Sequence, residues 1–263
     1  MNKTAIVTGG SSGIGLATAI ALHEEHGYDV YILSRREFNR EGLRHIRADV
    51  SQEQDVIRAV ETAAAEAGRI DLVVNCAGMG ISGALEFTDL EAAKRLFDIN
   101  FFGTVNVNKA AIPYLRASEG RIINISSVAG VVPIPFQSFY SASKAAINSY
   151  SLALANELKP FGIAVCAVMP GDTATGFTAA RVKSDQGDEL YQGRISRSVE
   201  KMEKDEQSGT ASSLSGKTIA KLALRRKLPP VYTIGFGYKL VNVLIRILPT
   251  GWSQKLIYGL YAR

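Results

Sequence analysis

Short apolar runs alternate along this chain with longer segments in which apolar residues recur every three or four positions. The short runs predict β-strands, and the longer segments predict helices that bury one face. Strands are expected at residues 4–8, 29–33, 44–48, 71–75, 120–125, 163–168 and 231–235. Helices are expected at residues 13–26, 52–67, 89–115, 138–159, 213–226, 237–248 and 252–261. Pro160 and Pro249 close two of these helices, because proline cannot continue one.

The alternation of strands and helices predicts an α/β fold with one doubly wound parallel sheet of about seven strands. The runs 70–74 and 163–168 are apolar on both faces, as central strands covered by helices must be. No internal repeat or linker interrupts the pattern, so residues 1–263 are expected to form a single domain. The polar stretch from Arg181 to Gly216 lacks strand character and predicts an excursion from the sheet.

A glycine-rich turn, TGGSSGIG at residues 8–15, joins the first predicted strand to the first predicted helix. In such a turn, backbone N–H groups and a helix N-terminus can face a pyrophosphate. Gly9, Ser11, Ser12 and Gly13 therefore form a candidate dinucleotide-binding loop, which favours a Rossmann fold. The spacing differs from GxGxxG, and a tight connection without a ligand is the alternative interpretation.

The end of the second predicted strand indicates which dinucleotide is preferred. A fold that prefers NAD presents an Asp or Glu there to the ribose 2′-hydroxyl, whereas this chain has Ser34, Arg35 and Arg36. A guanidinium binds a 2′-phosphate with fork geometry, and a serine hydroxyl can donate one more hydrogen bond. The three residues predict NADP(H), with Arg35 as the main contact. A solvated arginine pair is the alternative.

Tyr140 and Lys144 lie four positions apart in the predicted helix 138–159, so they share one helical face. A nearby ammonium, together with the charge of a nicotinamide, favours phenolate over phenol. We therefore expect the tyrosine pKa to fall from about 10 toward the range of a general acid/base. Ser126 and Ser127 end a strand thirteen residues before Tyr140, at the edge where such sheets bind ligands. YxxxK alone is frequent by chance, but this grouping predicts an active site.

With these motifs, the chain resembles the short-chain dehydrogenase/reductase family over roughly residues 3–176. Seven elements match the pattern of that family in order. They are TGxxxGxG at 8–15, Asp49-Val50, Asn75-Cys76-Ala77-Gly78, Asn100, Ser127, Tyr140-xxx-Lys144 and Pro170-Gly171-xxx-Thr175. The resemblance implies an NADP(H)-dependent oxidoreductase that transfers a hydride between the cofactor and a ketone, aldehyde or alcohol.

The resemblance also implies roles for four catalytic residues. Tyr140 would protonate a carbonyl oxygen during reduction, and Ser127 would polarise that oxygen. Lys144 would lower the tyrosine pKa and bind the nicotinamide ribose. Asn100 would hold a water that links the lysine to solvent. Ser126 should point to the other side of its strand and take no part.

Further cofactor contacts follow from the same resemblance. At the pyrophosphate they are Ile14 and Gly15. At the adenine and its ribose they are Asp49, Val50, Asn75, Ala77 and Gly78. At the carboxamide they are Pro170, Gly171, Thr173 and Thr175. No metal is expected, because the chemistry needs none and the three histidines His23, His26 and His45 fall far from Tyr140 in sequence.

The substrate is expected to be lipophilic. The resemblance implies that residues 176–216 form a lid, and the charged side chains in this run predict a solvated helix face. The apolar wall of the pocket is expected from Met79, Ile81, Leu85, Val131, Ile134, Phe136 and Phe177. The general layout most resembles the branch that contains the 17β-hydroxysteroid and retinol dehydrogenases. A 3-ketoacyl reductase and a non-catalytic NADP(H)-binding sensor are the alternatives.

Charge is unevenly distributed along the chain. Nine basic residues and no acidic residue follow Glu206, so residues 1–206 carry a net charge of −4 and the tail carries +9. The tail segment 237–263 predicts basic amphipathic helices, with Lys239 and Arg246 on the polar side of the first. We expect these helices to pack over the substrate cleft or across a dimer, with contact to a membrane surface as the alternative. Nucleic acid is not an expected partner.

Cys76 and Cys166 are too few for a disulfide framework and are expected to be free thiols of a cytoplasmic protein. No signal peptide is recognisable, and no apolar run reaches the ~18 residues of a transmembrane helix. A homodimer formed by helices 89–115 and 138–159 is the expected assembly. Tetrameric relatives end soon after their seventh strand, whereas this chain continues for about 28 residues past Gly235.

Overall fold

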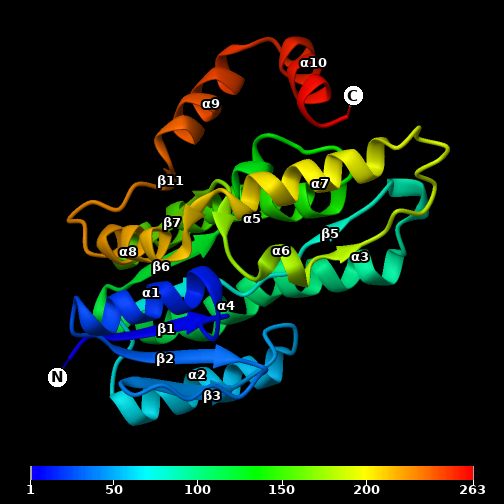
Figure 1. Cartoon of the computed structure of the whole chain (residues 1–263). Helices are drawn as coiled ribbons and strands as arrows, with labels where there is room; N and C mark the ends of the chain where they lie inside the picture. The colour runs from blue at the N-terminus through cyan, green and yellow to red at the C-terminus, as the bar shows by residue number, and fades with distance from the viewer. Residues whose placement is uncertain (1, 263) are drawn as a thin grey trace.

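The centre of the protein is a parallel sheet of seven strands in the order β11-β7-β6-β4-β1-β2-β3 (Figure 1). The computed structural model describes residues 2–262. The sheet strands are β1 (Thr4–Thr8), β2 (Asp29–Ser34), β3 (Leu43–Arg47), β4 (Leu72–Asn75), β6 (Arg121–Ile125), β7 (Ala164–Pro170) and β11 (Val231–Ile234). The predicted doubly wound sheet and its seven strands are confirmed.

Helices cover both faces of the sheet, because parallel strands are joined by crossovers that lie on those faces. α1 (Gly13–Glu24) and α8 (Ser212–Ala223) pack against each other over one face. α2 (Glu53–Ala67), α4 (Gly103–Ser118) and α5 (Ser138–Leu158) cover the other face. All five helices were predicted from the spacing of their apolar residues.

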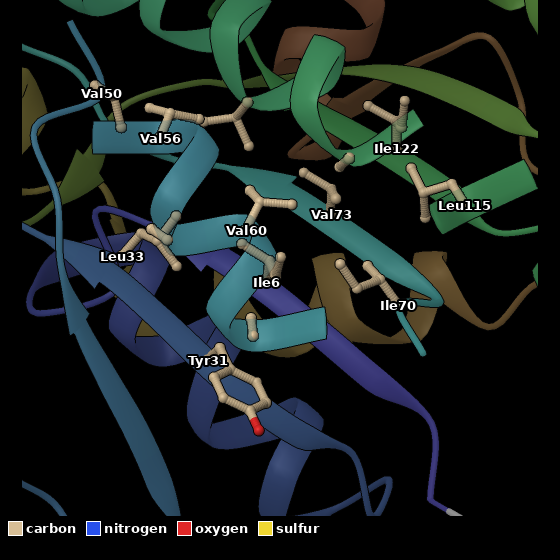
Figure 2. Close-up of a cluster of buried hydrophobic side chains, with 14 of the residues drawn as sticks. Ile6, Tyr31, Leu33, Val50, Val56, Val60, Ile70, Val73, Leu115 and Ile122 are labelled. Carbon is tan, nitrogen blue, oxygen red and sulfur yellow. The ribbon is translucent and has the colours of Figure 1, made fainter. Parts of the chain in front are cut away.

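Side chains alternate between the two faces along each strand. Ile6, Val73 and Ile122 belong to the cluster under α2, α4 and α5 (Figure 2). Their neighbours Val7 and Val74 belong to the cluster under α1 and α8. Burying a side chain of this size contributes ~1.5–3 kcal/mol relative to leaving it exposed, so a shift of one residue in a strand would be costly.

The predicted helix 89–115 is built from three pieces. α3 (Leu90–Phe97) is followed by a π-helical turn at Asp98–Phe102, and α4 continues from there. Asp89 caps α3 by accepting hydrogen bonds from the backbone N–H groups of Glu91 and Ala92. The π-turn contains Asn100, and the spacing of apolar residues did not reveal it.

Residues 176–216 leave the sheet as predicted, but the expected lack of strands is wrong at two points. β9 (Val182–Lys183) pairs with β5 (Ile81–Ser82), and β10 (Thr210–Ala211) pairs with β8 (Thr173–Ala174). Ladders of two residues are too short to show an alternating pattern in sequence. They fasten this lid to the loops that follow β4 and β7.

The lid also contains α6 (Phe177–Ala180) and α7 (Arg194–Gln207). The prediction of a solvated helix face is wrong for two of its charged residues, Arg181 and Glu206. Arg181 is buried and forms an ion pair with Glu206 at the end of α7. Thr178 Oγ1 donates to Oε2 of the same carboxylate at 2.5 Å. Because removing one partner would leave a buried charge, this pair ties α6 to α7.

The last two helices, α9 (Phe236–Ile247) and α10 (Thr250–Tyr261), project beyond the sheet and the lid (Figure 1). No residue of α9 is buried, so its apolar side does not pack over the cleft within one chain, and packing across a dimer stays a prediction. Tyr238 anchors α9 by donating a hydrogen bond to the Asp172 carboxylate. A Cβ atom on Gly171 would lie 2.1 Å from the Tyr238 ring, so this contact requires glycine.

We expect Gly171→Ala to lower the free energy of unfolding by about 1–3 kcal/mol, because the new methyl group would overlap the Tyr238 ring. Urea denaturation followed by circular dichroism would measure this loss. Gly176→Ala is the matched control, since no atom lies within 4 Å of a Cβ built there. Equal unfolding midpoints for the two variants would contradict the tight contact with Tyr238.

Candidate active site

Many of the predicted site residues come from loops at one edge of the sheet, where the parallel strands have their carboxyl ends, while Asn100 lies in the π-turn and Tyr140 and Lys144 lie in α5. The glycine-rich turn follows β1, residues 75–78 follow β4, Ser127 follows β6, and residues 170–175 follow β7. β1 lies between β2 and β4, so the chain order of the strands changes direction there. Doubly wound sheets bind ligands at such a position.

The glycine-rich turn is held in a conformation that suits a phosphate. Gly9 has a φ of 61°, and a Cβ atom on it would lie 2.9 Å from the backbone nitrogen of Ala77. Thr8 Oγ1 accepts hydrogen bonds from the N–H groups of Cys76 and Ala77 at 3.1 Å each. Ser12 precedes α1, but its side chain does not cap the helix. The N–H groups of the first turn thus have no side-chain cap and fit a bound pyrophosphate.

Arg35 follows β2 directly and is largely exposed. Its Nη1 lies 4.0 Å from Asp49 Oδ2, and an exposed pair of this kind is worth little. The guanidinium is therefore available to a phosphate, which is a stronger partner. Arg36 is also exposed.

Ser34 does not have the free hydroxyl that was predicted. Its side chain is buried, and Oγ donates to the Arg36 carbonyl oxygen at 2.9 Å. The same oxygen lies 3.0 Å from His45 Nε2. The Ser34 proton is therefore used inside the loop and is not offered to a phosphate in this conformation.

Two residues predicted along the nucleotide have side chains that are already engaged. Asp49 Oδ1 accepts from the N–H and the hydroxyl of Ser51, at 3.0 and 2.8 Å. The buried Asn75 side chain donates to Oδ1 of Asn108 at 2.7 Å and to Oδ1 of Asn124 at 2.9 Å. The Asn75 side chain thus points into the protein, which leaves its backbone for a cofactor. Val50 uses its carbonyl oxygen to accept from Asn106 Nδ2 at 3.0 Å.

Ser126 and Ser127 have different partners. Ser126 Oγ donates to the carbonyl oxygen of Lys144 at 2.8 Å, whereas Ser127 Oγ accepts from the N–H of Ala129 at 3.1 Å. A hydrogen bond with the Ser127 side chain lowers the pKa of Tyr140. Ser127 is therefore the serine at the phenol, and Ser126 fastens β6 to α5.

Lys144 and Asn100 both border Gly78. A Cβ atom on Gly78 would lie 3.2 Å from Asn100 Oδ1 and 3.7 Å from Lys144 Nζ. Lys144 Nζ donates to the carbonyl oxygen of Ile125 at 2.9 Å and lies 5.8 Å from the centre of the Tyr140 ring. Asn100 Oδ1 accepts from the Met79 N–H at 2.8 Å, and Nδ2 donates to the Met79 carbonyl oxygen at 3.0 Å. The four predicted catalytic residues thus border one region, and a water held by Asn100 stays a prediction.

Burial shifts the titration of Tyr140 and Lys144 toward their neutral forms. It raises the pKa of Tyr140 to about 12, while the Ser127 hydrogen bond acts in the opposite direction. It lowers the pKa of Lys144 to about 8. For the protein alone, the cost of burying a phenolate sets the direction of the tyrosine shift. The predicted lowering, which includes the charge of a nicotinamide, stays a prediction. A protonated phenol beside an ammonium suits donation of a proton to a carbonyl oxygen.

The loop after β7 lies against the glycine-rich turn. A Cβ atom on Gly13 would lie 3.5 Å from the side chain of Thr175. Thr175 Oγ1 accepts from the N–H of Phe177 at 3.1 Å, and Thr173 Oγ1 donates to the carbonyl oxygen of Gly171 at 3.0 Å. Thr175 keeps its hydroxyl proton for a ligand, whereas Thr173 uses its own within the loop.

Residues predicted for the pocket wall lie in two places. Phe177 covers the phenol, with its ring centre 5.7 Å from that of Tyr140. Ile81, Leu85 and Phe136 line a small cavity of about 10 Å³. The carboxylates of Glu206 and Asp172 were not predicted at the site, yet both raise the pKa of Tyr140. No local motif marks them, because the folded lid and the Tyr238 contact bring them there.

Comparison with known proteins agrees with this arrangement. The family model described as short chain dehydrogenase matches residues 3–186. A 3-ketodihydrosphingosine reductase from Bacteroides thetaiotaomicron is 46% identical over 232 residues, which cover 87% of this chain and 86% of that protein. A short-chain dehydrogenase from Streptomyces avermitilis superposes with a TM-score of 0.81 at 28% identity, covering 98% of each chain. ElxO with NADP bound has a TM-score of 0.75 at 26% identity, covering 91% of this chain and 100% of that one.

We expect Lys144 to titrate near pH 8, well below an ordinary lysine, because its burial disfavours the ammonium. Its charge is present below this pH and is lost as the pH rises through it. NMR of protein labelled with ¹³C at the lysine ε carbons should show one resonance with this midpoint. The resonance should be absent in Lys144→Met and retained in a variant of the exposed Lys159, Lys159→Met.

The same shift has a consequence for stability. Between the folded pKa of about 8 and the ordinary lysine pKa of 10.5, the unfolded chain binds more protons at this lysine. The contribution of Lys144 to stability should therefore increase with pH across that window. An unshifted midpoint in the NMR titration would contradict both expectations.

Proposed function

The chain belongs to the short-chain dehydrogenase/reductase family and is an oxidoreductase, and we propose that it reduces the ketone of a long-chain lipid with NADPH. One observation carries the proposal. Tyr140, with Ser127 beside it and Phe177 over it, lies in a chain that is 46% identical to a 3-ketodihydrosphingosine reductase. Steroid ketones and retinoid aldehydes form the other lipophilic class that the layout of the chain suggests.

Tyr140 is the proton donor in this proposal. Its phenol is protonated at neutral pH, because burial raises its pKa to about 12. It gives this proton to the carbonyl oxygen as negative charge develops there, and the Ser127 hydroxyl polarises the same oxygen. A charged Lys144 stabilises the phenolate that remains. The bound nicotinamide cofactor supplies the hydride to the carbonyl carbon.

An apolar cover over the proton donor supports a lipophilic substrate. Phe177 packs on Tyr140. The Arg181 guanidinium in turn lies 5.8 Å from the centre of the Phe177 ring. The ion pair between Arg181 and Glu206 connects the helix that contains Phe177 to α7 and so fixes the position of Phe177. Pockets lined by aromatic and aliphatic side chains, with a few polar groups at the reacting atom, favour hydrocarbon ligands.

Tyr140→Phe should reduce turnover by about 100-fold or more, since it removes the general acid. NADPH consumption with 3-ketodihydrosphingosine, a steroid ketone and a 3-ketoacyl thioester would identify the substrate class. NADPH affinity, measured by fluorescence, should be nearly unchanged in this variant. Tyr114→Phe is the matched control, because Tyr114 packs on the core under α4. Full activity of Tyr140→Phe would refute the assigned role.

Arg35→Asp should weaken NADPH binding by about tenfold or more, with little effect on NADH, because it replaces a charge-assisted contact by a repulsive one. Titrations of both cofactors against the wild type and the variant would measure the ratio of their affinities. Arg40→Asp makes the same charge change in a residue that pairs with Glu24. A wild-type preference for NADH would overturn the proposed choice of cofactor.

A further inference from the structure

The last two helices carry a concentration of exposed apolar side chains. Within residues 2–262, nineteen large apolar side chains are exposed, and ten of them lie between positions 236 and 260. Phe236 and Ile247 are the most exposed of these, at 78% and 75%. Contiguous apolar surface on this scale marks an interaction site.

Most of the exposed large apolar residues of α9 form one stripe that faces away from the protein. Five positions separated by four, three, one and three residues share one side of the helix, namely Phe236, Leu240, Val243, Leu244 and Ile247. The opposite side makes the contacts with the body of the protein. There, Tyr238 donates to Asp172, and Asn242 Nδ2 donates to Thr233 Oγ1 at 3.1 Å.

α10 is divided in the same way. Trp252, Leu256 and Leu260 recur every four residues, and all three are at least 48% exposed. Ser253 and Ile257 are buried on the adjacent side of the helix. α10 also contacts α7 of the lid. Each helix therefore holds one side on the protein and leaves large apolar side chains exposed on the rest of its surface.

Positive charge surrounds these stripes. The tail has nine basic residues and no acidic one, although Arg263 lies outside the described residues. Among residues 2–262 only Lys217 of this tail forms an ion pair, with Glu25. Arg225 and Lys239 come together over the Tyr232 ring, 5.3 and 4.9 Å from its centre. Cations therefore gather at the base of α9.

We propose that the outward stripes of α9 and α10 dock this protein on an anionic lipid bilayer, with both helices in the interfacial plane. Interfacial helices combine a Trp, Phe and Leu face with flanking Lys and Arg, and each cation near an anionic leaflet adds attraction. None of the helices described here has the length and apolar character needed to cross a bilayer. A second copy is a poorer occupant of this surface, because two tails of charge +9 would repel each other.

The chain provides its own probe, because Trp252 is its single tryptophan and is 69% exposed on the apolar side of α10. Full-length protein is mixed with phosphatidylcholine vesicles, with or without phosphatidylglycerol. The anionic vesicles should co-sediment the protein, shift the Trp252 emission to shorter wavelength and quench it when the lipids are brominated. High salt should weaken this binding. Unchanged emission and no co-sedimentation at low salt would overturn the proposal.

Substitutions in the apolar stripe and at the basic residues separate the hydrophobic and electrostatic contributions to vesicle binding. Leu240→Glu with Ile247→Glu should weaken vesicle binding by at least tenfold, because it places charge in the apolar stripe. Arg246→Ala and Lys255→Ala should each weaken it by about fivefold. Leu190→Glu is the matched control, since Leu190 is an equally exposed apolar residue of the lid, at 70%. It should bind like the wild type.

Sedimentation velocity tests whether a second copy of the chain covers this surface in place of a bilayer. If Leu240→Glu with Ile247→Glu dissociates a dimer while wild-type protein ignores the vesicles, the surface is an interface between copies and the proposal fails. All these readouts measure binding. A lack of vesicle binding would therefore leave the proposed reduction untouched. Inactivity toward lipid ketones would, in turn, not affect the binding results.

Discussion

The structure depends on a group of hydrogen-bonded amide side chains buried between the sheet and two helices. Asn75, Asn108 and Asn124 hydrogen-bond to one another, and Asn124 Nδ2 continues to Ser151 Oγ at 2.9 Å. Each buried polar group left without a partner would cost about 1–3 kcal/mol. These bonds fix β4, β6, α4 and α5 relative to one another directly beneath the catalytic edge. The apolar clusters supply most of the burial, but they specify such positions less sharply than directional bonds do.

The buried amides position the catalytic residues through the backbone of β6 and α5. Lys144 Nζ binds the last carbonyl oxygen of β6, and Ser126 Oγ binds the carbonyl oxygen of Lys144 itself. These two bonds lock the first turns of α5 to the end of β6, which brings Tyr140 and Ser127 together. Asn100 adds a third attachment, because Nδ2 donates to Ser143 Oγ at 3.2 Å. The catalytic groups are therefore held by partners that do not themselves react.

Much of this could be predicted from the sequence. Strands and helices were found because each buries one regular face, and the glycine turn and the Tyr-Lys spacing are local patterns. The engaged hydroxyl of Ser34 and the buried pair of Arg181 and Glu206 could not be found, since they depend on contacts between distant segments. The burial that raises the pKa of Tyr140 in the protein alone depends on such contacts too. A neighbouring charge can be inferred from spacing, but the depth at which a phenol is buried cannot.

The π-turn at Asp98–Phe102 constrains how this chain can change in length. Such a turn holds one residue more than an α-helical turn, so the faces of α3 and α4 are offset by about 100° from the register of a continuous helix. Deleting one residue here would restore regular hydrogen bonding, yet it would rotate α4 and remove Asn108 from its partners. Loops elsewhere tolerate gains and losses of residues, whereas this segment must keep the same number of residues. Alignments of related chains should therefore place their gaps on either side of Asn100 and not within the turn.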